Sequence, residues 1–272
     1  MSFKAVAWAL LAVVALATVV LFNHWASWQP LSTLVYAGFV LALCGLANAI
    51  LPFRFLGIRR RATGLLILAG GAGLAAVALF WPAATVRVAG GGSRLDQIMP
   101  EYQFHEVHSV RVHAGRERAM AAVKEATFED MTSLVTLMKI RGVVIRHPAE
   151  GLEKMQAKRI MESFGESGYI AAGRDGEMGM YGAFNYVKQK PAGLKTVEEF
   201  AAYRENGAVK MAFDFVVEDA GGGWSRVTTE TRVMVHGMTR GMASYWRLIV
   251  PGSGLLRLEW LEGIKRRAEE RG

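Results

Sequence analysis

The sequence predicts an α+β domain, with a long C-terminal helix laid across an antiparallel sheet, preceded by three transmembrane helices. Three observations lead to this fold class. The first 81 residues contain no Asp and no Glu and hold three long apolar runs. Two regions, 169–184 and 208–235, alternate apolar and polar residues as strands do. The chain then ends in a segment whose apolar residues lie four apart, which is typical of a helix packed on a sheet.

The three apolar runs predict membrane spans. They cover residues 5–22, 31–53 and 62–81, and none of them contains a charged residue. A helix rises about 1.5 Å per residue, so about 20 residues cross a hydrocarbon core of roughly 30 Å. A cleaved signal peptide is the alternative for the first run. No small-x-small cleavage motif follows it, so we expect a retained helix and assign residues 1–83 to the membrane part.

Basic residues in the short loops predict the orientation of these spans. Lys4 precedes the first run, and Arg54, Arg59, Arg60 and Arg61 separate the second from the third, whereas loop 23–30 has no Lys or Arg. Cytoplasmic loops are the ones enriched in Lys and Arg. We therefore expect an integral protein of a bacterial inner or plasma membrane, with a cytoplasmic N-terminus and an extracytoplasmic C-terminal domain.

Charge and cysteine content exclude several classes of partner. Five basic residues lie in the membrane part, which leaves 32 − 5 = 27 basic against 24 acidic residues, or a charge of +3, in the remainder of the chain. The basic excess thus reflects topology and gives no sign of a nucleic-acid partner. The single Cys44 excludes disulfides and Cys-based metal sites within one chain.

Glycines in the third run resemble a dinucleotide-binding motif. Gly71-x-Gly73-x-x-Ala76 matches that pattern, but no strand precedes it and no βαβ unit follows. Small residues also allow transmembrane helices to approach closely, and we favour that interpretation. The same patch is compatible with a membrane-protein partner.

The rest of the chain predicts a flexible linker, 84–99, and a folded domain, 100–272. Glycines 90–92 suggest the hinge. Strands are expected over 102–113, 169–173, 177–184, 208–218 and 224–235. Helices are expected over 116–130, 131–140, 148–164, 197–203 and 239–250, with a last helix capped by Ser253 after a break at 251–254.

Three segments carry a family resemblance: residues 177–184 (EMGMYGAF), residues 228–233 (TTETRV), and residues 245–249 (YWRLI) together with 251–254 (PGSG) and 265–268 (KRRA). Residues 102–270 resemble the SRPBCC superfamily, the helix-grip fold of START lipid-binding domains, polyketide cyclases and aromatic-ring hydroxylase subunits, in a bacterial branch that is itself uncharacterised. The resemblance implies a cavity between the long helix and the sheet, which superfamily members use for lipids or other apolar ligands.

Several residues are candidates for such a cavity, and each also has an ordinary structural role open to it. Threonines suit strand cores, aromatic residues suit helix–sheet packing, and Glu230 with Arg232 suits an ion pair on the face opposite the threonines. The candidates are Thr229, Thr231, Tyr181, Arg232, Tyr245, Trp246 and Trp260.

No catalytic, metal or cofactor motif is present. His105 and His108 point to opposite faces of their strand, and His105 lies about 26 Å from His113 at about 3.3 Å per residue, so these histidines form no metal site. The leading hypothesis is membrane-anchored binding of a lipid or other apolar small molecule, without catalysis. The alternatives are a cyclase- or hydrolase-type enzyme that uses the same cavity, and a structural subunit of a membrane assembly.

Overall fold

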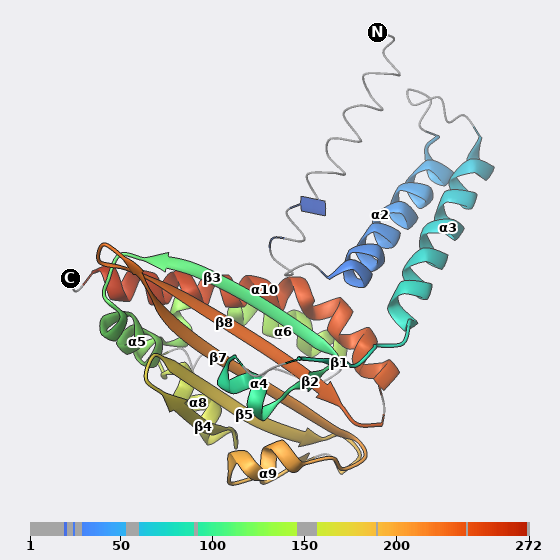
Figure 1. Cartoon of the computed structure of the whole chain (residues 1–272). Helices are drawn as coiled ribbons and strands as arrows, with labels where there is room; N and C mark the ends of the chain where they lie inside the picture. Colours follow the sequence, from blue (N-terminus) through green and yellow to red (C-terminus); the bar gives the residue numbers. More distant parts are fainter. Residues whose placement is uncertain are drawn as a thin grey trace. The chain divides into compact units, whose positions relative to one another are not determined.

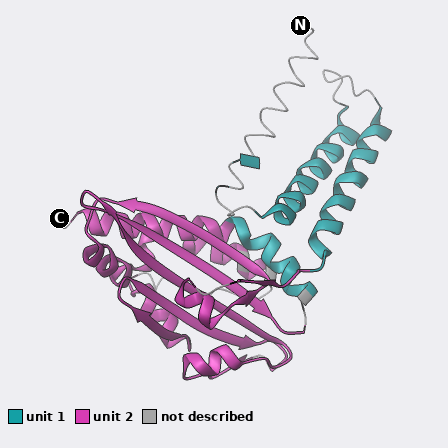
Figure 2. Cartoon of the chain, viewed as in Figure 1, with its two compact units in different colours: residues 1–82, 240–251 teal, residues 83–239, 252–272 magenta. Residues whose placement is uncertain are grey.

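The computed structural model describes residues 19–20, 24, 29–52, 60–89, 92–145, 157–188, 190–237 and 239–270. They belong to two compact units (Figure 2). Unit 1 comprises residues 1–82 and 240–251, and unit 2 comprises residues 83–239 and 252–272. Nearly all of the expected span 5–22 and most of the expected helix 148–164 lie outside the described residues.

Unit 1 contains helices α2 (Pro30–Ile50) and α3 (Arg61–Phe80), which match the second and third expected spans. Both are long and apolar enough to cross a membrane. Their outer faces expose large apolar side chains, among them Leu43 and Leu66. Such surfaces are unfavourable in water and favourable in lipid.

Four glycines form the seam between α2 and α3. Gly38 and Gly45 on α2 and Gly64 and Gly71 on α3 are buried at seven-residue spacing. A Cβ added at Gly38 would lie 2.6 Å from the Ala75 amide nitrogen, and one at Gly71 would lie 2.5 Å from that of Ala42. The two backbones therefore touch directly, as expected for small residues between membrane helices. Gly70 and Gly73 have open space around them.

The end of α3 is capped by side chains from residues 240–251 of helix α10 (Thr239–Glu269). Arg247 Nη1 donates to the carbonyls of Leu79 at 2.7 Å and Trp81 at 2.6 Å, and Ser244 Oγ donates to Leu79 at 3.1 Å. The last carbonyls of a helix lack partners within the helix, and a cation suits that end of its dipole. Arg247 thus satisfies carbonyl groups at the end of α3, which a C-terminal glycine cap would do in many other helices.

Helix α10 continues through Pro251, so the expected break at 251–254 is wrong. Proline cannot donate a helical hydrogen bond and disturbs the turn before it. In that turn the Leu248 carbonyl accepts a hydrogen bond from the Tyr36 hydroxyl at 2.5 Å. Ser253 consequently caps no helix and lies inside α10.

Unit 2 is built on an antiparallel sheet with the strand order β3-β8-β7-β5-β4, and β6 also pairs with β5 (Figure 1). The strands are β3 (Phe104–Val112), β4 (Ile170–Arg174), β5 (Glu177–Asn185), β6 (Lys190–Pro191), β7 (Ala208–Gly221) and β8 (Trp224–Val235). A small second sheet pairs β1 (Val86–Arg87) with β2 (Glu101–Tyr102). The α+β class predicted from the sequence is confirmed.

Helices cover both faces of the large sheet (Figure 1). The inner face packs against α5 (Arg116–Glu125), α6 (Leu134–Ile145), α8 (Ile160–Glu166) and residues 252–269 of α10. The outer face packs against α4 (Arg94–Ile98) and α9 (Val197–Ala202). Trp260 of α10 is at the centre of the inner layer, with its ring 4.7 Å from that of Phe215 and 5.7 Å from that of Phe213.

Further expected boundaries are wrong, among them that of helix 131–140, which in the structure is α6 and extends to Ile145. Residues 84–99 were expected as a linker, but they hold β1 and α4, and a capping box between Ser93 and Asp96 begins α4. Leu95 is fully buried in the outer layer, which explains why this stretch is folded. The expected helix 116–130 ends at Glu125, and a 3₁₀ turn, η2 (Phe128–Asp130), follows.

The glycine seam can be tested with two adjacent leucine substitutions. We expect Gly71→Leu to lower the thermal stability of the full chain in detergent, because its side chain must displace the α2 backbone, at a cost of at least about 1–3 kcal/mol. Gly70→Leu is the control, since it enters open space. Equal effects of the two variants on the melting temperature would show that the seam is not a close backbone contact.

Candidate functional site

Polar residues are buried on the inner face of the sheet, beneath α10. Side chains alternate between faces along a strand, and residues directly opposite on neighbouring strands share a face. Glu106 pairs with Thr231, which pairs with Phe213, and His108 pairs with Thr229, which pairs with Phe215. Since Phe213 and Phe215 pack on Trp260, the polar residues in these rows face α10 as well.

Glu106 connects the sheet to α10. Ser253 Oγ donates to Glu106 Oε2 at 2.7 Å, and Glu106 Oε1 lies 3.0 Å from His108 Nε2. Glu106 and His108 are both buried. Each carboxylate oxygen therefore has one polar partner, which offsets much of the cost of burying this carboxyl group.

Arg257 is the exceptional residue of this layer. Its guanidinium carbon lies 4.6 Å from the ring centre of Phe213 and 5.2 Å from that of Trp260, and the residue is 9 % exposed. Nη1 has no hydrogen-bond partner, and Arg257 forms no ion pair within the described part of the chain. Burial lowers the pKa of Arg257, and the nearby charge of Glu106 acts in the opposite direction.

Thr229 adds a second unpaired group, because its buried Oγ1 also has no hydrogen-bond partner among the residues that the structure describes. Burying an unpaired charge or hydroxyl is costly. A guanidinium surrounded by aromatic rings suits a carboxylate or phosphate, since its planar donors match the oxygens of these groups. We call Glu106, His108, Thr229, Ser253 and Arg257 the inner polar cluster.

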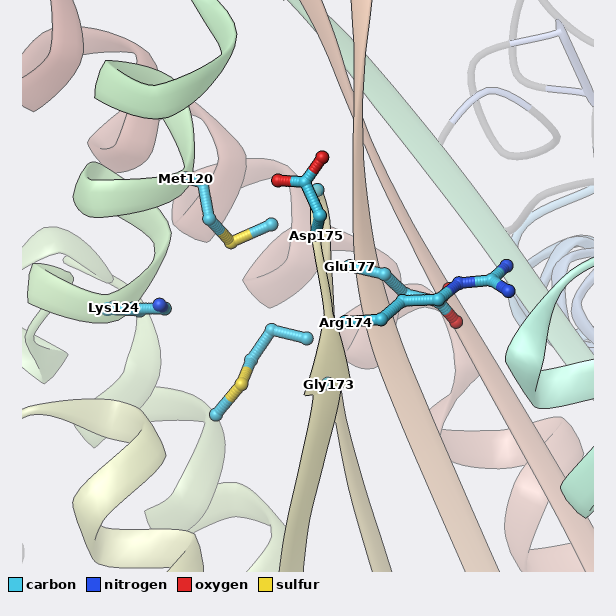
Figure 3. Close-up of a pocket in the computed structure, with 8 residues that line it drawn as sticks. Met120, Lys124, Gly173, Arg174, Asp175 and Glu177 are labelled. Carbon is cyan, nitrogen blue, oxygen red and sulfur yellow. The ribbon is translucent and has the colours of Figure 1, made fainter.

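The pocket in Figure 3 lies away from this cluster, between α5 and the β4–β5 hairpin. Its volume is about 300 Å³, and Met120 and Lys124 form its wall on α5. Arg174 and Glu177 of the hairpin extend away from these two side chains (Figure 3). None of the residues expected in the ligand site lines this pocket.

The residues expected to line one cavity do not share a face. Thr229, Thr231 and Trp260 lie in the inner layer. Tyr181 and Arg232 pair with Ala212, which belongs to the outer layer, so they cannot line a cavity beneath α10. Tyr245 and Trp246 belong to the part of α10 that lies in unit 1.

Four members of the inner polar cluster were missed in the sequence: Glu106, His108, Ser253 and Arg257. Their spacing carried a signal, because Glu106 and His108 are two apart on a strand, and Ser253 and Arg257 are four apart on a helix. Each pair therefore shares one face. The predicted helix break at Pro251 concealed the second pair.

Arg232 holds α4 on the outer face. Its Nη2 donates to Asp96 Oδ1 at 2.5 Å, its Nη1 to the Met99 carbonyl at 3.0 Å, and its Nε to Glu230 Oε1 at 2.5 Å. Glu230 also lies 2.9 Å from His105 Nε2. The Glu230–Arg232 ion pair predicted from the sequence is confirmed, on the face opposite the threonines. All three bonds of Arg232 go to the protein itself, which indicates a structural role.

Asp214 is a buried carboxyl group on the outer face, and no described side chain pairs with either of its oxygens. Burial, followed by the charges of Glu230 and Glu177, raises its pKa to about 7. Its cross-strand neighbour is Gly179, and the Tyr181 hydroxyl occupies the space that a Gly179 side chain would take. Burial and the charge of Asp214 raise the pKa of Tyr181.

Comparison with known proteins finds no match: no protein-family model, curated protein or solved structure matches the chain.

Asp214 predicts a pH dependence of stability. Its pKa is about 7 in the folded chain and about 3.9 in an unfolded one, so folding favours the protonated form. Stability should fall as the pH rises from about 4 to 7, by an amount on the order of 4 kcal/mol, since one pKa unit corresponds to about 1.4 kcal/mol. Asp214→Asn should stabilise the full chain at pH 8 and flatten the dependence of its melting temperature on pH. Exposed Asp175→Asn is the control, and parallel curves for all three proteins would contradict the assignment.

Proposed function

We propose that the chain is a membrane-anchored binding protein for an amphiphile, an apolar molecule with an anionic head group, held beneath α10 in a domain of the helix-grip type. The observation that carries this proposal is the buried Arg257 guanidinium with its unpaired Nη1. The resemblance of residues 102–270 to the SRPBCC superfamily supports the same position for the ligand.

The charges around Arg257 favour an anionic ligand. Glu106 is the nearby acid on the inner face, but Ser253 and His108 already occupy its two oxygens. An incoming carboxylate or phosphate would supply the missing ion pair, and Thr229 Oγ1 offers a further hydrogen bond. Charge-assisted hydrogen bonds of this kind are the strong ones.

The surroundings favour an apolar body for the ligand. Side chains fill the inner layer around the cluster, among them Phe213, Phe215, Trp260 and Met180. A ligand would have to displace some of these side chains, and methionine adapts readily to a new neighbour. We therefore expect the inner layer to open when the ligand binds.

The membrane would supply such ligands at high local concentration. Helix α3 ends at Phe80 and unit 2 begins at Ala83, so the connection spans at most about 11 Å. A tether this short keeps the domain at the bilayer surface. We place the domain on the extracytoplasmic side, because the arginine-rich loop between α2 and α3 is expected to be cytoplasmic. Alkaline phosphatase fused to the C-terminus should then be active in cells, and an inactive fusion would contradict this orientation.

Arg257→Met tests the binding proposal in the full chain. We expect an amphiphilic carboxylic acid or phosphate to co-purify with the wild type. The affinity of the protein for this molecule should fall about tenfold or more in Arg257→Met. The ligand-free variant should melt at a higher temperature than the wild type, because it no longer buries an unpaired charge.

Arg266→Met is the matched control on the same helix, because Arg266 pairs with Asp130 and is half exposed. It should leave binding unchanged. The proposal fails if mass spectrometry of the purified wild type finds no enriched amphiphile. It also fails if Arg257→Met lowers stability and leaves binding intact, since a purely structural role predicts that result.

A second candidate function is hydrolysis at Ser253. The Ser253 hydroxyl donates to a buried carboxylate that in turn contacts a histidine, and a nucleophile next to a base is the arrangement that acyl-transfer enzymes need. Glu106 would accept the hydroxyl proton as Ser253 Oγ bonds to an ester carbonyl, and would pass it to the alkoxide that leaves as the ester C–O bond breaks. Water would then hydrolyse the acyl-serine to release the acid and restore the hydroxyl.

Ser253→Ala separates this candidate from simple binding. A hydrolase should cleave p-nitrophenyl esters and react with a fluorophosphonate probe, and both activities should vanish in Ser253→Ala and persist in Ser244→Ala. A wild type that shows neither activity would eliminate the candidate, whereas the proposed binding would persist in Ser253→Ala.

A further inference from the structure

Helix α6 presents an exposed face that is both apolar and basic. Thr136, Lys139, Ile140 and Val143 follow one another at helical spacing, and all four are exposed. Ile140 is 55 % exposed and Val143 80 %. We call these four residues the α6 face. Large apolar side chains this exposed on neighbouring turns indicate a surface with an apolar partner.

The opposite side of α6 is fixed to unit 2. Leu134 and Met138 pack in the inner core, and a Cβ added at Gly252 of α10 would lie 3.5 Å from the Leu137 side chain. At the start of the helix, Glu259 accepts hydrogen bonds from Thr132 and from the amide and hydroxyl of Ser133. The α6 face is therefore presented outward by a helix that is anchored along its other side.

Charge and position identify the partner. Lys139 precedes Ile140 on the α6 face, so an exposed basic residue lies next to the exposed apolar ones. This combination is typical of segments that lie in the head-group region of anionic bilayers. Unit 2 begins at Ala83, three residues after the end of α3, in a chain with two helices long and apolar enough to cross a membrane.

We propose that the α6 face contacts the lipid bilayer, with Ile140 and Val143 inserted among the head groups and Lys139 placed against anionic lipid. This contact is a second attachment to the membrane, in addition to α2 and α3. It does not depend on any ligand beneath α10.

Site-specific fluorescence in the full chain tests this contact. Cys44 is exposed and is first replaced, as Cys44→Ser. Single cysteines are then introduced by Ile140→Cys, Val143→Cys and, as a control on exposed α9, Glu198→Cys, and each carries an NBD label. In vesicles of phosphatidylcholine and phosphatidylglycerol, labels at 140 and 143 should emit at shorter wavelength and be quenched by nitroxide-labelled lipid. The label at 198 should show neither effect.

A charge reversal completes the test. Lys139→Glu should reduce quenching at position 143 by about two- to fivefold in anionic vesicles and have little effect in pure phosphatidylcholine. The proposal is overturned if labels at 140 and 143 behave like the label at 198. It is also overturned if they are shielded without lipid quenching at high protein density, which would identify a second copy of the chain as the partner.

Discussion

The packing of Trp260 on Phe213 and Phe215 is the contact on which unit 2 depends. It joins α10 to β7, the middle strand of the sheet, and buries three large rings in one layer. Such rings contribute strongly to stability because each removes a large apolar area from water. Phe213 and Trp260 also lie against the Arg257 guanidinium, so the rings that stabilise the fold border a buried charge with an unpaired donor.

Strand alternation separates two polar systems that differ in kind. On the outer face, Arg232 is fully engaged by Asp96, Met99 and Glu230, and the result is a clamp on α4. On the inner face, Arg257 lacks such partners within the described residues. The donors of Arg232 are used within the protein, whereas Nη1 of Arg257 has no partner among the described residues. This difference, rather than fold class, distinguishes the candidate site from the surrounding structure.

Local patterns predicted most of the fold. The alternation in 208–218 and 224–235 and the turn at 221–223 correspond closely to β7 and β8, and the apolar runs 31–53 and 62–81 correspond to α2 and α3. The helix break predicted at Pro251 is wrong, because tertiary packing before and after this residue keeps α10 helical. In an isolated helix the proline would be expected to end the helix. The site was harder to predict. Thr229 and Trp260 were among the candidates, but the idle donor of Arg257 results from contacts between β7 and α10, which no local pattern encodes.

The spacing of the seam glycines sets the alignment of α2 against α3. Gly38 lies beside Gly71, and Gly45 beside Gly64, about 10 Å apart along the axis. If one helix moved along the other by seven residues, glycine would face glycine at only one of these two contact points. At the other contact point a glycine would face a bulkier residue. The absence of side chains at the two contact points also means that joining the helices freezes few rotamers. The pair of helices therefore has one favoured axial alignment, and forming it costs little side-chain entropy.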